Sequence, residues 1–189
     1  MIKSLGSNVD IEELIITILS SCPEGVDGRT AIQKLGYLSS VKLNMDAGYE
    51  ADLYGPFSPI VASNLQTLVE FDFVVEKARQ TVRNRTMYNY YLTADGHQFA
   101  EVINKKFPTE HRIISKVVNA CSRIVNCNYR SLSWASKVHF ILKKTEKPMN
   151  YTEAMNAGKL FGWKLNQSEV EAGVKLLQAL HLILVDTEK

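Results

Sequence analysis

The sequence is poor in the residues from which most metal and redox sites are built. Its three cysteines, Cys22, Cys121 and Cys127, are an odd number at spacings that match no zinc or redox motif. Cys121 and Cys127 are six residues apart, so on one helix they would point to different sides. We therefore expect buried, reduced thiols, no metal site and no cofactor.

Long apolar segments are also missing. The longest apolar run extends from Leu14 to Leu19, which is far too short to cross a bilayer. The chain does not open with a basic segment that leads into an apolar stretch and a cleavage site. We therefore expect a cytoplasmic protein that does not contact a membrane.

Patterns that mark catalytic sites are absent from the sequence as well. A nucleophile needs a base within hydrogen-bond reach and a group that orients the base. No HxxxH, CxxC or paired-carboxylate spacing occurs, and the four histidines stand singly: His97, His111, His139 and His181. Gly55 is a lone glycine and not part of a phosphate-binding loop. These observations predict a protein that is not an enzyme.

The net charge is small, at +2, but its distribution along the chain is uneven. Residues 1–105 carry 9 Lys and Arg against 13 Asp and Glu, whereas residues 106–189 carry 13 against 7. Such an asymmetry indicates that the two halves face different surroundings. It also argues against strong phosphate binding by the first half alone.

Capping signals predict three helices in the first 71 residues. Asp10 with Glu13 forms a capping box before an apolar run, and a second helix covers about Arg29–Leu43. The third is Ser58–Phe71, in which Ser58 is a good N-cap and Pro59 fits the first helical position.

A β-hairpin and a fourth helix follow. Two strand-like runs between Val74 and Leu92 flank a polar loop, and Thr93 caps a helix that extends to about Lys106. Helix, helix, turn, helix, hairpin is the order of a winged helix-turn-helix. We therefore predict a mainly α-helical protein with a small β-hairpin, in which residues 1–106 form a winged-helix domain.

Residues 107–189 are predicted to form a helical domain. Thr109 is expected to cap a helix through Val125, and another helix covers Leu132–Lys144. Capping boxes at Asn150 and Asn166 begin two more helices, which end near Gly162 and at Leu180, and a strand is expected over Leu182–Val185. Apolar residues of 65–74 align with those of 174–183, which indicates a second, wingless helix-turn-helix-like unit. Duplication and convergence on a common helix-to-strand junction both explain the alignment.

Two motifs resemble a known group of proteins. They are Arg29-Thr30-Ala31-Ile32-Gln33-Lys34-Leu35-Gly36-Tyr37-Leu38 and Tyr54-Gly55-Pro56-Phe57-Ser58-Pro59, followed by a Leu-rich helix that leads into an apolar strand. This arrangement is similar to that of the YwgA-like proteins and the related Panacea group, which includes SocA-type antitoxins. The resemblance covers roughly residues 28–76. It implies a winged-helix-like fold, no enzymatic activity, and a role as a regulator or an adaptor-like antitoxin. Ile60 departs from the acidic residue that these families often carry near this point.

The first functional hypothesis is a dimeric transcriptional regulator that binds double-stranded DNA. The third helix would lie near the major groove, and the hairpin cations would contact the phosphate backbone. The candidate nucleic-acid-binding residues are Ser63, Gln66, Thr67, Lys77, Arg79, Arg83 and Arg85. The helix Thr109–Val125 is the candidate interface of a homodimer. Hairpin charges that serve solubility alone are the simpler alternative.

The second hypothesis is a protein–protein interaction module of antitoxin or adaptor type. It follows from the family resemblance, from the acidic first half and from the third helix, which carries Glu70 and no Lys or Arg. The tyrosines and phenylalanine that precede this helix, Tyr49, Tyr54 and Phe57, suit either core packing or a partner-binding surface.

Overall fold

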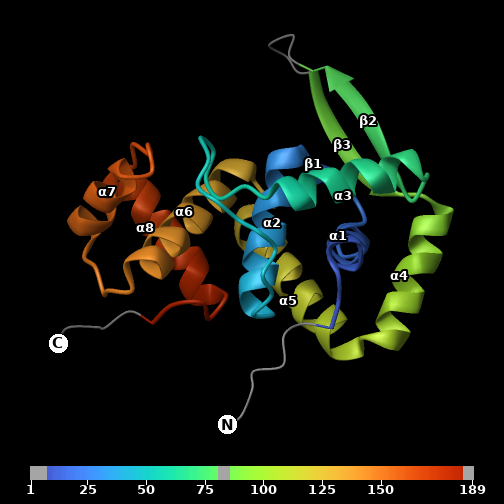
Figure 1. The fold of residues 1–189 in the computed structure, drawn as a ribbon. Helices are drawn as coiled ribbons and strands as arrows, with labels where there is room; N and C mark the ends of the chain where they lie inside the picture. Colours follow the sequence, from blue (N-terminus) through green and yellow to red (C-terminus); the bar gives the residue numbers. More distant parts are fainter. Residues whose placement is uncertain (1–7, 81–85, 185–189) are drawn as a thin grey trace.

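The computed structural model describes residues 8–80 and 86–184 and shows a mainly helical protein with a small three-stranded antiparallel sheet (Figure 1). The elements in chain order are α1 Ile11–Ser20, β1 Val26–Asp27, α2 Arg29–Lys42, α3 Pro59–Glu70, β2 Val74–Gln80, β3 Thr86–Leu92, α4 Ala94–Lys106, α5 Pro108–Val125, α6 Tyr129–Thr145, α7 Tyr151–Lys159 and α8 Gln167–Ala179.

The predicted starts of the first and third helices are confirmed. The Asp10 side chain accepts a hydrogen bond from the Glu13 amide, and the Glu13 carboxylate accepts one from the Asp10 amide. At the start of α3, the Ser58 hydroxyl accepts a hydrogen bond from the Val61 amide at 3.1 Å, and Pro59 occupies the first helical position.

The sheet contains one strand that the sequence did not predict. β1 pairs antiparallel with β3, which in turn pairs with β2, so that β3 is central. β1 has only Val26 and Asp27, too few residues to show the alternation by which strands are recognised. The hairpin itself is confirmed, with Val74 opposite Leu92 and Gln80 opposite Thr86.

The beginning of α5 differs from the prediction. Thr93 caps α4 as expected, since its hydroxyl accepts a hydrogen bond from the Gly96 amide. Thr109, however, does not cap α5, which begins one residue earlier at Pro108. Proline can begin a helix without a side-chain cap, because the N–H group at the first helical position makes no hydrogen bond within the helix and proline lacks that group.

The last helices begin as predicted, but the final strand is wrong. Both capping boxes, at Asn150 and Asn166, are present. Residues 182–184 form no strand, and residue 185 lies outside the described residues. Asp72 and His181, which the internal alignment pairs, both have positive φ, at 60° and 52°. Each is followed by an amide that bonds back to the helix, so the shared pattern is a common helix-termination motif.

α1 is the centre of the core. Its residues 13–19 are all buried, because α1 packs against α2, α3, α4 and α5 at once (Figure 1). α2 continues the packing toward α5 and α6, and α6 packs on α8. The apolar contacts therefore run from the N-terminal helices into the C-terminal ones.

Cys127 does not share a helix with Cys121, and the prediction of buried thiols is wrong for Cys22 and Cys127, which are half-buried. α5 ends at Val125, and Asn126 and Cys127 both have positive φ, so the chain folds back and the Cys127 amide reaches the carbonyl of Cys121 at 3.3 Å. The thiols of Cys22 and Cys127 share a hydrogen bond, which raises the pKa of Cys22 and lowers that of Cys127. All three cysteines are free, and only Cys121 is fully buried.

Candidate functional site: an anchored loop before α3

The segment between α2 and α3 ends in a tightly structured turn. The Gly55 amide bonds to the Asp52 carbonyl at 2.9 Å, and Gly55 has a φ of 101°, which favours glycine. Glu50 and Phe57 then pair across the turn through two backbone hydrogen bonds of 2.9 and 3.0 Å. The residues 52–58 are called the anchored loop below.

Two neighbouring residues of α2 hold this loop from one side. The Gln33 amide group bonds to both backbone groups of Ser58, donating to its carbonyl at 2.9 Å and accepting from its N–H at 3.0 Å. The Lys34 ammonium donates to the Pro56 carbonyl at 2.7 Å. The two resemblance motifs therefore contact one another directly, and their polar residues support the loop.

Lys34 is an unusual group for a protein interior. Its exposed fraction is 2%, and burial lowers its pKa to about 8, with Asp52 opposing this effect and Lys137 adding to it. A buried charge is tolerated only where other groups compensate it. Here the Pro56 carbonyl and the negative charge of Asp52 provide the compensation, so Lys34 and the loop depend on each other.

The C-terminal helices hold the loop from the other side. The indole N–H of Trp163, which follows α7, donates to the Asp52 carbonyl at 2.7 Å. Lys137 of α6 places its ammonium 5.5 Å from the centre of the Trp163 ring, and its side chain runs past Gly55. The loop is thus fixed between α2 and the α6–α8 region, far apart in sequence.

Although its backbone is anchored, the loop presents apolar side chains to solvent. Leu53 is 69% exposed and Tyr54 61% exposed, and two more large apolar residues follow within the next six positions. We call this set the loop patch: Leu53, Tyr54, Phe57 and Ile60. Single exposed apolar residues are ordinary, but a cluster on a rigid support is typical of an interaction surface.

The structure places the predicted α3 residues beside this patch. Ser63 and Gln66 are exposed and Thr67 is half-buried, so the predicted outer face of α3 is confirmed. The Gln66 side chain donates to the Glu70 carboxylate at 3.1 Å. The face therefore offers a hydroxyl, an amide and a negative charge.

The described hairpin cations are exposed and lie near other groups. Arg79 forms an ion pair with Asp27 of β1 at 3.3 Å, and Lys77 lies over the Tyr91 ring with its nitrogen 5.3 Å from the ring centre. Arg29 at the start of α2 pairs with Glu76 at 3.0 Å, and Tyr90 donates to the same carboxylate. Arg83 and Arg85 lie outside the described residues.

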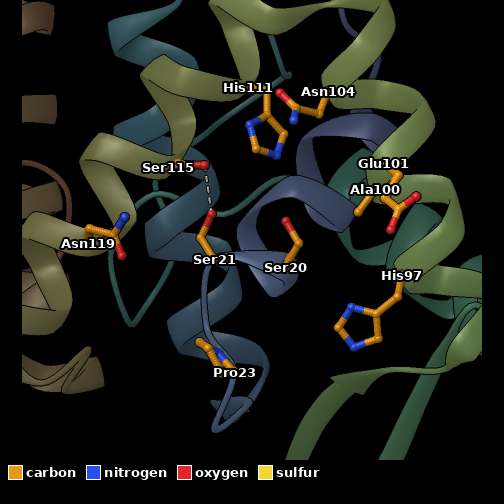
Figure 2. Close-up of a pocket in the computed structure, with 10 residues that line it drawn as sticks. All are labelled: Ser20, Ser21, Pro23, His97, Ala100, Glu101, Asn104, His111, Ser115 and Asn119. Atoms are coloured by element: carbon orange, nitrogen blue, oxygen red, sulfur yellow. Dashed lines mark hydrogen bonds between the residues drawn. The ribbon is translucent and has the colours of Figure 1, made fainter.

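A second feature is a polar cleft of about 500 Å³ between the end of α1, α4 and α5 (Figure 2). Figure 2 shows His97 and His111 at opposite ends of the cleft, with the hydroxyl of Ser20 between them. The Ser20 and Ser21 hydroxyls donate to the Thr17 carbonyl. The Ser21 hydroxyl also donates to the Ser115 hydroxyl of α5 at 2.9 Å, the bond drawn as a dashed line in Figure 2.

Metal-binding clusters and membrane-spanning helices were searched in residues 8–80 and 86–184. Over these ranges, no group of three or more His, Cys, Asp or Glu side chains could hold a metal ion. None of the helices found there has the length and apolar character that crossing a membrane requires.

Comparison with known proteins adds no relative. No protein-family model matches the chain, and no curated protein is significantly similar to it.

Proposed function

We propose that residues 1–106 form a winged-helix domain. The support is the order α1, β1, α2, α3, β2, β3, with a short strand between the first two helices and a hairpin directly after α3. In Figure 1 the hairpin projects away from the helical body beyond α3, as a wing does. The likeness to YwgA-like and Panacea proteins agrees with this assignment.

We propose further that the protein is a non-catalytic protein–protein interaction module. The observation that carries this proposal is the loop patch, in which apolar side chains are exposed on a backbone held by Gln33, Lys34 and Trp163. A surface that is already rigid loses little conformational entropy when a partner binds. A few residues near the centre of an interface contribute most of its binding energy, and tyrosine is enriched among them.

The charge of the neighbouring surface favours a protein over a nucleic acid. α3 contains no Lys or Arg and ends with Glu70, which repels phosphate. An apolar patch beside a neutral and acidic helix suits a protein partner with an apolar centre and a basic rim.

The test compares two double variants in the cells that express the protein. L53S/I60S removes half of the loop patch, and V102S/L184S removes two other exposed apolar residues, from α4 and from the segment after α8. We expect a crosslinked partner to be retained by the wild type and by V102S/L184S, and to fall about tenfold or more with L53S/I60S. Quantitative mass spectrometry of the crosslinked complexes measures this ratio.

All four positions are on the surface, so both variants should fold, which circular dichroism checks. The proposal is overturned if no crosslinked protein decreases with L53S/I60S, or if each one decreases by the same factor with the control variant.

DNA binding by a dimeric regulator is the second candidate, and the projecting hairpin favours it. Lys77 and Arg79 are exposed on the outermost described part of β2. The Arg79 side chain of the Arg79–Asp27 ion pair is more than half exposed. Surface ion pairs of this kind are weak, so Arg79 can release Asp27 and bind a phosphate group instead. In this candidate α3 would approach the major groove, and α5 would form the homodimer interface.

Binding to labelled mixed-sequence duplex DNA over a range of salt concentrations tests this candidate. If Lys77, Arg79, Arg83 and Arg85 all contact phosphates, log K should fall against log salt with a slope of about −3 to −4 per protomer. The triple variant R79A/R83A/R85A should reduce this slope to about −1, whereas L53S/I60S should leave it unchanged. Absence of binding at about 50 mM salt would rule out the regulator.

A further inference from the structure

A cavity of about 630 Å³ lies between the C-terminal half of α2, the chain that follows it and the C-terminal half of α6. It is distinct from the loop patch and from the cleft of Figure 2, which other residues line. A volume of this size is within the range of small-molecule sites.

The cavity wall is mixed, with one aromatic part among polar residues. In that part Tyr37 packs edge-on against Tyr49, with ring centres 5.1 Å apart, and is inclined to Phe140 at 6.4 Å. Val41 and Met45 add aliphatic surface. This part of the wall suits a planar ring, because aromatic rings prefer edge-to-face and offset contacts.

A hydrogen-bonded pair of polar side chains lies at one wall. The Tyr37 hydroxyl and the Nδ1 of His139 are 2.8 Å apart, and Tyr37 is almost fully buried. Burial, together with the smaller effect of the Lys143 charge, lowers the pKa of His139 to about 4, so the imidazole is neutral at pH 7. The pair can therefore exchange hydrogen bonds with a ligand without adding charge to the cavity.

The charge at the rim is positive. Lys143 and Lys144, on the last turn of α6, both line the cavity and are exposed, and the Lys144 ammonium lies 5.4 Å from the Phe140 ring centre. Asp46 is the lining carboxylate, and it accepts a hydrogen bond from the Gly48 amide at 3.0 Å. Because two ammonium groups line the rim and the one lining carboxylate already accepts a hydrogen bond, the local charge favours an anionic ligand.

We propose that this cavity binds a small aromatic carboxylate. The ring would lie among Tyr37, Tyr49 and Phe140, and the carboxylate would face Lys143 and Lys144. The proposal does not depend on the function proposed above.

One contact links the cavity to the anchored loop. The Tyr49 hydroxyl donates to the Gln33 carbonyl at 2.9 Å, and the Gln33 side chain holds Ser58. A ligand that packs against Tyr49 therefore contacts the same network that fixes the loop.

The experiment titrates the full-length protein with three probes of similar shape and different charge, namely benzoate, benzyl alcohol and benzylamine. Two-dimensional ¹H–¹⁵N NMR follows the amides of residues 37–49 and 139–144. We expect saturable shifts at these amides with benzoate, with a dissociation constant in the millimolar range for so small a ligand. Benzyl alcohol should bind more weakly and benzylamine should not saturate.

The variants make the assignment specific. K143Q/K144Q should weaken benzoate binding about fivefold or more, because two cations near the carboxylate are lost. K116Q/K175Q removes two exposed lysines elsewhere and should leave the affinity unchanged. The proposal is overturned if benzoate gives no saturable shift at these amides, if benzylamine binds equally well, or if both variants bind as tightly as the wild type.

Discussion

Lys34→Ala is expected to lower the free energy of unfolding by about 3 kcal/mol and to release the anchored loop. The substitution removes three buried methylene groups and the ammonium group and leaves a cavity, which typically costs about 2–5 kcal/mol. It also removes the donor of the Pro56 carbonyl. Urea denaturation measures the stability loss, and hydrogen exchange at residues 52–58 measures the release of the loop.

Lys34→Met separates the packing of this side chain from its charge. Methionine fills most of the volume and avoids the desolvation of an ammonium group, so we expect it to stay within about 1–2 kcal/mol of the wild type at pH 7. The protection of the amides of residues 52–58 from hydrogen exchange should still fall, because the hydrogen bond to the Pro56 carbonyl is lost. Unchanged exchange at residues 52–58 in both variants would contradict the anchoring role of Lys34.

The pH dependence of stability provides an independent check on the burial of Lys34. Its pKa in the folded protein is about 8, below the ordinary value of 10.5, so between these values the unfolded chain binds more protons. The wild type should therefore gain stability relative to Lys34→Met as pH rises from about 8 to 10.5, by up to roughly 3 kcal/mol. A constant difference between the two proteins across this window would show that Lys34 is not desolvated.

Gly96→Ala is expected to lower the free energy of unfolding by more than about 3 kcal/mol. Gly96 lies in the first turn of α4, and a Cβ atom there would overlap with the Phe73 carbonyl oxygen and press on the Leu92 side chain. The obstacle at Phe73 is backbone at the start of the hairpin, so it cannot move away without displacing the strand or the helix. Thermal denaturation followed by circular dichroism measures the loss.

Gly158→Ala is the matched control for this prediction. Gly158 is also helical and buried, but a Cβ atom there would meet its neighbours at ordinary distances of 3.4 and 3.5 Å. Alanine is the better helix former, so this variant should be neutral or more stable by up to about 1 kcal/mol. Equal stability changes in the two variants would contradict the close approach of α4 to the hairpin.

The helix boundaries were predictable because capping is local chemistry. Five N-cap side chains each accept a hydrogen bond from the amide three residues further on: Asp10, Ser58, Thr93, Asn150 and Asn166. Such bonds need only the sequence around them. The prediction was wrong at Thr109 because Pro108 can begin α5 without a side-chain cap. It was also wrong for α6, which begins at Tyr129 after an Asn128 cap and not at Leu132.

The candidate site was only half predictable. The sequence identified the two motifs around Gln33 and Gly55 and the outer face of α3, but it did not indicate that Lys34 is buried. Lys34 lies inside because the anchored loop folds over α2 and presents the Pro56 carbonyl to it. Charged residues are seldom fully buried, so no pattern in the sequence indicates such a position.

The sequence by itself determined the mainly helical character of this protein, the start of most helices and the hairpin, because these depend on periodicity and on neighbours within a few residues. The tertiary structure decided three other features: the pairing of the short strand β1, the return of Cys127 toward Cys22, and the support of the loop patch by Lys34 and Trp163. Each of these joins residues that are distant in the chain. Their contacts depend on how the helices pack around α1, which local propensity does not encode.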